Sequence, residues 1–416
     1  MTPAARLQSL LELIPIITDG SRPMDEALQN YFIIRRFMGS QDRRFIKENL
    51  YNIARTYGHH HSAWSQFSQR ESINCDRAVL LSYLWSVQKK SEEDLYGYFT
   101  GEKYAPQPIS SYELSFIKWL PTQKISDWDY FNVSEPIWNI LQKQWTKEQI
   151  SRELEALDGE APLDLRVNLS KISRDQLIKL LLKENIKASE TPLSPSGIRI
   201  NGRPRLQALT AYKNGFFEIQ DEGSQILSLI VGAQPGEIIV DYCAGAGGKT
   251  LAMADHMQNK GRIIALDKNL RRLERAKERI KRADVRIVEF VAEGLKEKCE
   301  AVLADVPCSG SGTWRRHPEL KWVFNLKSFD EIKETQQAIL EEAAFYVKPG
   351  GRLVYSTCSI FFEENQDQIE KFLRNHSDFK LHPICFPPLK STSYLTLTPY
   401  TAGTDGFFAA VLIKMQ

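Results

Sequence analysis

The sequence predicts an α/β protein whose C-terminal half forms a mostly parallel, doubly wound sheet. From about residue 220 onward, short apolar segments alternate with helical ones, the pattern of a parallel sheet covered by helices on both faces. A glycine-rich loop follows the first of these apolar segments. The N-terminal residues instead repeat apolar side chains at helical spacing. We therefore expect an all-α domain over 1–125, a small α+β module over 126–215 and the sheet domain over 216–416.

The helical domain is predicted from four amphipathic segments, 7–14, 27–38, 43–57 and 77–87. Glycine and proline are expected to punctuate them, because glycine weakens a helix and proline ends one. Three glycines break the pattern and three prolines mark its end: Gly39, Gly58, Gly101, Pro106, Pro108 and Pro121.

The α+β module is predicted from strand-like and helical segments that follow one another. Residues 163–169 alternate as a strand does, and residues 173–185 predict a helix with Ser173 as its N-cap. Residues 197–200 and 212–220 add strand character, the latter around a turn at Asn214 and Gly215.

Five apolar strands are predicted in the sheet domain, over 237–242, 262–267, 285–290, 301–306 and 352–357. In open sheets of this kind, ligands bind beyond the carboxyl ends of the strands. We therefore expect the chemistry of this protein to lie at that edge of the sheet.

The composition predicts a folded protein without membrane spans or metal sites. Of the 416 residues 42% are hydrophobic, yet no apolar run reaches the ~20 residues of a membrane helix. The N-terminus lacks the features of a secretory signal, so we expect a cytoplasmic location. The six cysteines form no CxxC pair, which argues against zinc and against a disulfide framework. The histidines at 59–61 lack companion ligands, so we expect a solvated loop there rather than a metal site.

Two basic segments bear on nucleic-acid binding, because the net charge of +2 alone does not. The first mixes cations with aromatic residues, which suits unpaired RNA bases and phosphates and suits an amphipathic helix equally well. Its members are Tyr31, Phe32, Arg35, Arg36, Phe37, Arg43, Arg44, Phe45 and Lys47. We interpret the second, 268–282, as a helix with a solvated basic face and a buried stripe of Leu270, Leu273, Ala276 and Ile280.

The loop after the first strand, 242–250, has three interpretations. A phosphate-binding P-loop needs a glycine five residues before Lys249, where this chain has Ala244. A dinucleotide fold needs a third glycine where Thr250 stands. A loop for S-adenosylmethionine needs small residues beside the methionine part and an acid after the second strand for the ribose, and Asp267 supplies that acid. The alternative for Asp267 is an N-cap of the following helix.

Two cysteines are predicted at the carboxyl ends of strands, Cys308 after the fourth and Cys358 after the fifth. A helix follows Cys358, and helix N-termini favour thiolates. A thiolate that adds to carbon 6 of cytosine makes carbon 5 nucleophilic toward a methyl sulfonium, and an acid such as Asp305 near ring nitrogen 3 stabilises the adduct. The base must leave its stack to reach such a site. We interpret the remaining strand and loop cysteines as buried hydrophobic residues: Cys75, Cys299 and Cys385.

Several motifs over 165–416 resemble the RsmB/Nop2/Sun family of RNA 5-methylcytosine methyltransferases. The most specific are DVPCSGSGTWRRHPELKW at 305–322 and YSTCS at 355–359. FFEIQDEGSQ at 216–225 and GTDGFFAAVLIK at 403–414 also look like family motifs. The resemblance implies a Rossmann-like class I methyltransferase domain that uses S-adenosyl-L-methionine.

The resemblance also implies a role for individual residues. Cys358 attacks carbon 6, Cys308 assists release of the methylated base, and Lys249 with Asp305 hold the target cytosine. Contacts to the cofactor are implied for Cys243, Ala244, Gly245, Ala246, Gly247, Gly248, Lys249, Asp267, Glu289 and Asp305. Glu289 stands for the family's acid after the third strand, with Glu293 as the alternative. The family loop usually reads CAAPGGKT, so this chain lacks its proline but loses no side-chain contact.

The N-terminal helices resemble the NusB-like domain of some bacterial members, which implies RNA binding and points to 16S rRNA first and transfer RNA second. We therefore expect a monomeric, S-adenosylmethionine-dependent RNA (cytosine-5) methyltransferase that binds RNA and neither metal nor membrane. The alternative is a non-catalytic RNA-binding or ribosome-assembly protein that kept the fold. The presence of both cysteines, Lys249 and Asp305 argues against that alternative.

Overall fold

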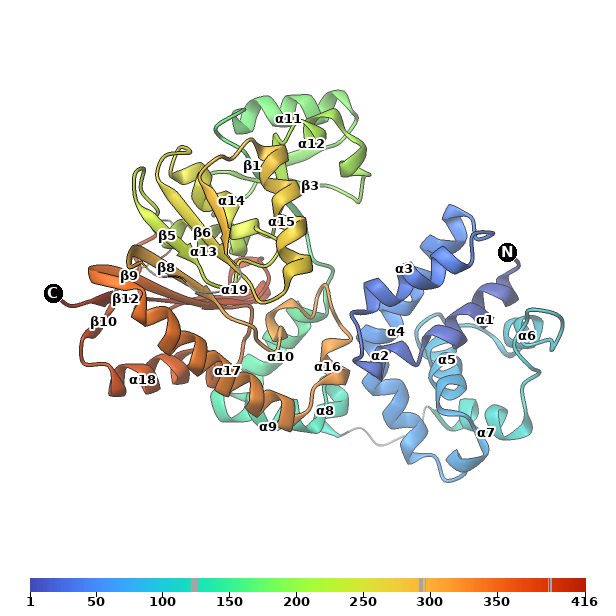
Figure 1. The fold of residues 1–416 in the computed structure, drawn as a ribbon. Helices are drawn as coiled ribbons and strands as arrows, with labels where there is room; N and C mark the ends of the chain where they lie inside the picture. The colour runs from blue at the N-terminus through green and yellow to red at the C-terminus, as the bar shows by residue number, and fades with distance from the viewer. Residues whose placement is uncertain (121–125, 292–294, 296, 388, 390) are drawn as a thin grey trace. The chain divides into compact units, whose positions relative to one another are not determined.

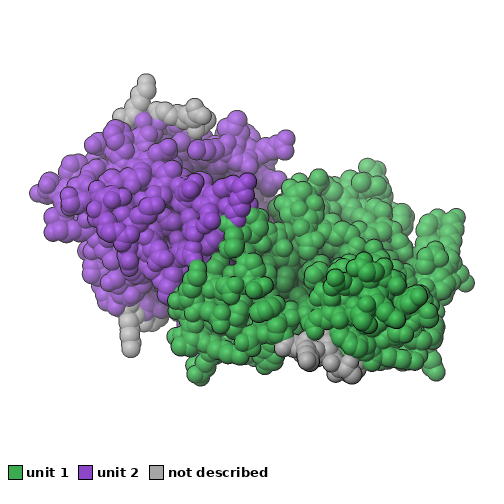
Figure 2. Space-filling view, turned by 90° about the horizontal axis from the view of Figure 1, so that it is seen from below, with its two compact units in different colours: residues 1–158, 316–326 green, residues 159–315, 327–416 purple. Residues whose placement is uncertain are grey.

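The computed structural model describes residues 1–120, 126–291, 295, 297–387, 389 and 391–416. The chain divides into two compact units (Figure 2). Unit 1 comprises 1–158 and 316–326, and unit 2 comprises 159–315 and 327–416. The chain thus returns to unit 1 for one short segment in the middle of unit 2. The three-domain division expected from the sequence remains a prediction.

Unit 1 has a helix at each of the four predicted segments (Figure 1), although the second helix, Met24–Ile34, ends before the predicted residue 38. The apolar faces of its first helices form the main core, in which Leu10, Ile46, Ile53 and Leu80 are fully buried. The helices of unit 1 are α1 Pro3–Leu13, α2 Ile16–Asp19, α3 Met24–Ile34, α4 Ser40–Gln66, η1 Arg70–Ser72, α5 Cys75–Ser86, α6 Glu92–Tyr98, α7 Ser111–Trp119, α8 Asp127–Tyr130, α9 Glu135–Gln144, α10 Lys147–Asp158 and α16 Leu320–Val323.

Helix α4 continues through two features that the sequence suggests as breaks. The prediction that Gly58 interrupts the helix, and that residues 59–61 form a solvated loop, is wrong. A Cβ at residue 58 would lie 2.6 Å from Cη2 of Trp322, so glycine is needed there for packing. His60 is 2% exposed, its Nδ1 lies 2.8 Å from Ser82 Oγ, and burial lowers its pKa to about 3.

The basic segment near the N-terminus is largely engaged within unit 1. Phe32 and Phe45 pack against the core, whereas Phe37 is exposed. Three of its cations form the ion pairs Arg35–Glu12, Arg44–Glu48 and Lys47–Asp25. Its interpretations as an RNA-binding surface and as an ordinary amphipathic face both remain predictions.

The first part of unit 2 is a four-stranded antiparallel sheet in the order β2-β3-β1-β4. Its strands and helices are β1 Leu163–Val167, α11 Arg174–Lys183, β2 Ala188–Glu190, β3 Gly197–Ile200, η3 Leu206–Ala208, α12 Thr210–Lys213 and β4 Phe217–Ile219. The predicted N-cap is confirmed, because Ser173 Oγ accepts a hydrogen bond from the Gln176 amide. The predicted strand over 212–220 is only partly right, because 210–213 is helical and the strand begins after Gly215 at Phe217.

The second part of unit 2 is a larger sheet in the order β10-β12-β9-β8-β5-β6-β7, with β11 paired to β12. Strands β9, β8, β5, β6 and β7 are parallel, and β12 lies antiparallel between β9 and β10. The predicted mostly parallel sheet is therefore confirmed. Its strands are β5 Ile238–Asp241, β6 Arg262–Leu266, β7 Val288–Val291, β8 Cys299–Asp305, β9 Val347–Thr357, β10 Phe379–His382, β11 Leu395–Leu397 and β12 Phe407–Lys414.

Helices cover both faces of this sheet (Figure 1), as the doubly wound prediction requires. Alternate residues of a buried strand face opposite layers: Ile239 packs with α13 and α14, and Val240 packs with α17 and α18. The helices of this part are α13 Glu222–Ile230, α14 Gly248–His256, α15 Leu270–Ala283, η4 Ser311–Thr313, α17 Leu326–Phe345, η5 Phe362–Glu364, α18 Gln366–Asn375 and α19 Pro399–Ala402. The expected stripe of α15 is buried except for Leu270, which is exposed.

The strand order reverses at β5, which has β6 on one side and β8 on the other. A crevice forms at such a switch point, outside the carboxyl ends of the strands. The loops after β5, β6 and β8 are therefore the place to look for a site. In the part of the chain that the structure describes, no helix is long and apolar enough to cross a membrane.

Candidate active site

The glycine-rich loop joins β5 to α14 and needs glycine at two positions. Gly245 and Gly247 have φ of +56° and +77°, a region that residues with a Cβ rarely adopt. A Cβ on Gly245 would also lie 2.5 Å from Arg272 Nη2, and one on Gly247 would lie 3.0 Å from Ala276 Cβ. The loop therefore lies close against α15 and presents its backbone at the crevice.

Asp267 follows β6 and joins this loop to the next one. Its Oδ2 accepts a hydrogen bond from Gly245 N, and its Oδ1 accepts one from Asn269 N, both at 2.7 Å. The N-cap of α15 is Asn269, whose Oδ1 accepts hydrogen bonds from the backbone amides of Arg271 and Arg272. Asp267 is therefore not the cap of that helix. Each carboxylate oxygen keeps a second lone pair, which a hydroxyl group of a ligand can use.

Lys249 and Asp305 form an ion pair at the same edge of the sheet. Lys249 Nζ, on α14, donates to Asp305 Oδ2 at 2.6 Å, where β8 ends. Ser356 Oγ, on β9, donates to the other oxygen of Asp305 at 2.8 Å. Burial alone lowers the pKa of Lys249, but the charge and hydrogen bond of Asp305 outweigh it and raise that pKa. The lysine therefore stays charged at neutral pH.

The two strand-end cysteines meet at this edge of the sheet. Cys308 follows β8, Cys358 follows β9, and their sulfur atoms lie 3.3 Å apart. Both are partly accessible. The hydrogen bond with Cys358, in which the Cys308 thiol is the donor, and burial raise the pKa of Cys308 well above its ordinary value. Two negative sulfurs at this distance would repel strongly, so the pair holds one thiol when the other sulfur ionises.

Asp241 is a residue of the site that the sequence analysis missed. It ends β5, is buried, and its Oδ2 accepts a hydrogen bond from Thr250 Oγ1 at 2.6 Å. Its Oδ1 is buried with no partner among the described residues. Burial raises the pKa of Asp241 to about 7. The signal in the sequence is an acid at the end of an apolar strand, the same signal that points to Asp267 and Asp305.

The remaining predicted loop residues lie around the same turn. Ala244 N donates to Leu266 O at 2.8 Å, and Ala246 O accepts from Arg279 Nη1 at 2.7 Å. Gly248 begins α14. Burial, and then the charge of Asp305, raise the pKa of the Cys243 thiol.

Glu289 is the one described residue of the predicted set that lies elsewhere. Both of its carboxylate oxygens accept hydrogen bonds from Arg262, at 3.1 and 2.8 Å. Arg262 begins β6, whereas Asp267 follows its end. Glu289 therefore points toward the amino end of the sheet, away from the glycine loop. Its alternative, Glu293, lies outside the described residues.

The hydrogen-bond acceptors at this edge of the sheet fit a ligand with a ribose and an ammonium group. Asp267 has acceptor capacity for hydroxyls, and the unpartnered oxygen of Asp241 can accept from a cationic nitrogen. The glycine backbone leaves room for close approach. Among the described residues, no group of three or more His, Cys, Asp or Glu side chains could hold a metal ion.

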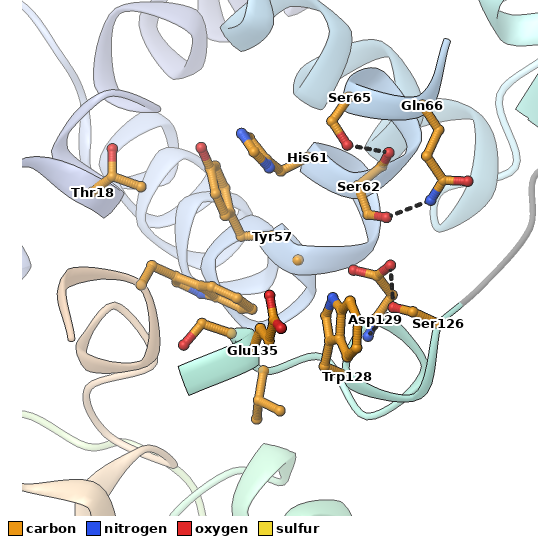
Figure 3. Close-up of a pocket in the computed structure, with 14 residues that line it drawn as sticks. Thr18, Tyr57, His61, Ser62, Ser65, Gln66, Ser126, Trp128, Asp129 and Glu135 are labelled. Atoms are coloured by element: carbon orange, nitrogen blue, oxygen red, sulfur yellow. Dashed lines mark hydrogen bonds between the residues drawn. The ribbon is translucent and has the colours of Figure 1, made fainter. Parts of the chain in front are cut away.

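A separate hollow of about 740 Å³ lies in unit 1 (Figure 3). Tyr57 and His61 of α4 form one wall, and Trp128 of α8 lies across from them. Trp322 also lines it. None of the residues that line the hollow belongs to the predicted catalytic or cofactor set, so the candidate chemistry stays at the sheet of unit 2.

Known proteins resemble this chain in sequence. The family model described as 16S rRNA methyltransferase RsmB/F matches residues 228–413, and one described as an RsmF/B-like ferredoxin-like domain matches 136–207. The probable ribosomal RNA small subunit methyltransferase B of Synechocystis sp. is 32% identical over 310 residues, which cover 71% of this chain and 70% of that protein.

Solved structures share the fold as well. PH0851 is 24% identical, with a TM-score of 0.80 over 100% of this chain and 99% of that one. NSun6 from Pyrococcus horikoshii, solved with SFG, is 23% identical, with a TM-score of 0.62 over 68% of this chain and 98% of that one.

Proposed function

This chain belongs to the RsmB/F family of 16S rRNA methyltransferases, and on that premise we propose that it methylates carbon 5 of a cytosine in 16S rRNA. The observation that carries the proposal is the pair of sulfurs, Cys308 and Cys358, 3.3 Å apart at the carboxyl ends of two neighbouring strands. One pyrimidine can contact both sulfurs at once. The Lys249–Asp305 pair beside them offers a donor and an acceptor for the polar edge of that base.

The cofactor in this proposal is S-adenosylmethionine. Asp267 would accept from its ribose, Asp241 from its ammonium group, and the backbone of 243–249 would lie against its methionine part. Bound there, it supplies an electrophilic methyl group on a sulfonium sulfur. A structural neighbour, NSun6 from P. horikoshii, was solved with SFG, an analogue of this cofactor.

Cys358 is the attacking thiolate in the proposed reaction. Its sulfur forms a bond to carbon 6, and the electron pair of the carbon 5–carbon 6 double bond moves into the ring, which makes carbon 5 nucleophilic. After methylation, a base takes the proton from carbon 5, the carbon 6–sulfur bond breaks, and its electron pair returns to the sulfur. Cys308 lies within reach of that sulfur and assists this release.

Lys249 and Asp305 hold the base and stabilise the adduct. Lys249 is charged, because the carboxylate of Asp305 raises its pKa, and so it places a positive charge where the ring becomes electron-rich. A proton shared between Lys249 and Asp305 is the acid for ring nitrogen 3. Ser356 fixes Asp305 from the other side.

Unit 1 has an RNA-binding role in this proposal, as a NusB-like domain. Its helices within 1–120 belong to the region whose resemblance to a NusB-like domain implies RNA binding. The catalytic crevice itself admits only a base that has left its stack. An exposed nucleotide of 16S rRNA is therefore the expected target.

The purified protein should transfer a labelled methyl group from S-adenosylmethionine to 16S rRNA, and mass spectrometry of the digested nucleosides should identify 5-methylcytidine. Bisulfite sequencing of total RNA, with and without the gene, should show one cytosine of 16S rRNA that loses its protection. The matched control is Cys358→Ala, which should bind RNA and transfer no methyl.

Three outcomes would contradict the proposal. A methyl group on another atom or base would remove the cytosine-5 assignment. Modification of transfer RNA alone would replace the substrate. Binding of RNA and cofactor without any transfer by the unaltered protein would favour a non-catalytic role.

A further inference from the structure

A fully buried carboxylate lies directly behind the two cysteines. Glu364, at the end of η5, is 0% exposed. Its Oε1 accepts hydrogen bonds from Ser309 N at 2.7 Å and from Gln336 Nε2 at 2.9 Å. Its Oε2 accepts from Ser309 Oγ at 2.5 Å and from Ser359 Oγ. Within the described chain, no lysine or arginine forms an ion pair with Glu364, which is unusual for a carboxylate removed from water.

Apart from Gln336 of α17, the donors to the Glu364 carboxylate come from the two cysteine loops. Ser309 follows Cys308 directly, and Ser359 follows Cys358 directly. One carboxylate therefore joins the two loops at positions one residue away from each sulfur.

Two further bonds tie the same loops together. Gly312 N donates to the carbonyl of Cys358 at 2.9 Å, and Ile360 N donates to Ser311 Oγ at 2.9 Å. The hydroxyls of Ser311 and Ser359 lie 2.9 Å apart. These bonds, and the three that Ser309 and Ser359 donate to Glu364, fix the separation of the loops and with it the sulfur–sulfur distance.

Charges of opposite sign flank the two sulfurs. The groups that face Cys308 are Tyr355 of β9, Cys358 after that strand, and the Glu364 carboxylate. The charge of Glu364 disfavours a negative charge on the Cys308 sulfur. The ammonium of Lys249, from α14, interacts favourably with a negative Cys358, and Asp305 of β8 accompanies it as its ion-pair partner. A proton shared by the two sulfurs is thus drawn toward Cys308.

We propose that Glu364 is a positioning residue: its hydrogen bonds fix the two cysteine loops, and its negative charge, held beside Cys308 by Ser309, leaves Cys358 as the sulfur that attacks. The inference rests on the proposed function, since it explains which of two adjacent thiols attacks. A carboxylate with a merely structural role would hold the loops but would not set the order in which the thiols ionise.

The test is alkylation of the two thiols by iodoacetamide as a function of pH, without RNA or cofactor. Initial rates are measured by mass spectrometry of the two cysteine peptides. In the unaltered protein, Cys358 should react at a lower pH than Cys308. In Glu364→Gln, which keeps the size of the side chain and removes its charge, the midpoint for Cys308 should fall by about one pH unit, a roughly tenfold gain in its rate below the midpoint.

The matched control is Glu363→Gln, which removes an equal charge from the neighbouring residue, where the carboxylate pairs with Lys333. It should leave both pH profiles unchanged. Identical profiles in Glu364→Gln and the unaltered protein would overturn the charge role of Glu364.

The proposal stays testable if Glu364→Gln does not fold. Circular dichroism identifies that case. The alkylation profiles of the unaltered protein then test the proposal: reaction of Cys308 at the same pH as Cys358, or at a lower pH, overturns it. Ser309→Ala adds a second arm, because it removes one hydrogen bond to Glu364 and keeps the charge. It should preserve the order of ionisation, and reversal of that order would count against the proposal.

Methylation assays separate this inference from the proposed function. Glu364→Gln should lower kcat about tenfold or more and leave KM for RNA nearly unchanged, because no contact to RNA is removed. Glu364→Asp, which keeps the charge, should recover part of the lost kcat. An unaltered protein that alkylates in the expected order but transfers no methyl to RNA would contradict the proposed function alone.

Discussion

Burial of Asp241 makes the stability of the folded protein depend on pH. Burial raises its pKa to about 7, whereas in the unfolded chain it titrates near 3.8. Between these values the native state holds a proton that the unfolded state has lost, so the stability from this group is present below the lower value and is lost as pH rises through the upper one.

Asp241→Asn should remove this loss of stability, because an amide carries no charge to bury. As the pH rises from 5 to 8, the unaltered protein should lose on the order of 2 kcal/mol more free energy of unfolding than the variant does. Urea unfolding at both pH values measures it. Asp284→Asn is the control, an exposed position with positive φ that asparagine tolerates. An unchanged pH dependence in Asp241→Asn would contradict the assigned cause.

At the residue scale, the sequence predicted the side chains that lie at strand ends. Cys308, Cys358, Asp305 and Asp267 all follow apolar strands, and the parallel sheet brings such positions to one edge. It could not predict Glu364, because that carboxylate acts through hydrogen bonds to loops that only the folded chain brings together. The local sequence of these loops does not predict those hydrogen bonds.

At the element scale, helix α15 packs against the glycine-rich loop between β5 and α14 and supports it. Arg279 Nη1 donates to the carbonyl of Ala246 at 2.7 Å, and its Nε donates to the buried Glu218 at 3.0 Å. Arginine 279 thus connects the loop to β4 of the small sheet. The basic residues of this helix were expected to face solvent, yet Arg279 also positions the loop.

Arg279→Met should loosen the loop and weaken the binding of S-adenosylmethionine about fivefold, which corresponds to roughly 1 kcal/mol for one charged hydrogen bond. Isothermal titration calorimetry with the cofactor alone measures this. Arg275→Met, on the exposed face of the same helix, should bind as the unaltered protein does. Equal affinities for the two variants would exclude this supporting role.

Helix α4 depends on glycine for a reason that lies far away in the sequence. Alanine normally stabilises a helix relative to glycine by about 1 kcal/mol. At residue 58, however, the added Cβ would lie 2.6 Å from Trp322, whose Nε1 is held by a 2.6 Å hydrogen bond to Ala54 O. We therefore expect alanine at residue 58 to destabilise the helix, the opposite of its usual effect.

Gly58→Ala should destabilise the protein by about 1–3 kcal/mol, the usual cost of overpacking. Gly97→Ala, in α6, should be neutral or stabilising, because nothing lies within 4 Å of the added Cβ. Chemical denaturation of both variants gives the comparison. If Gly58→Ala is as stable as Gly97→Ala, the packing explanation fails.

At the scale of the whole molecule, the family-like motif over 305–322 is divided between the two units. Its first part, through Arg315, belongs to unit 2, where Arg315 pairs with Asp405. Its last part belongs to unit 1, where buried Lys321 pairs with Asp158. Adjacent residues of one motif thus stabilise different units.

The sequence predicted the order of helices and the parallel sheet because their apolar periodicity is local. It predicted neither the division of this motif nor the passage of α4 through Gly58 and the histidines at 59–61. Both depend on contacts between segments more than 150 residues apart, such as Lys321 with Asp158 and Trp322 with Ala54. The predicted third strand, 285–290, begins too early, because its pairing with β6 starts only at Val288.

The central claim is that two sulfurs share one cytosine and divide attack and release between them. Cys308→Ala, incubated with 16S rRNA and S-adenosylmethionine, tests it most directly by denaturing gel electrophoresis. We predict that a covalent protein–RNA adduct accumulates in this variant and is absent in the double variant that also carries Cys358→Ala. Normal methylation by Cys358→Ala, or the absence of an adduct while Cys308→Ala binds and methylates the RNA, would contradict the claim.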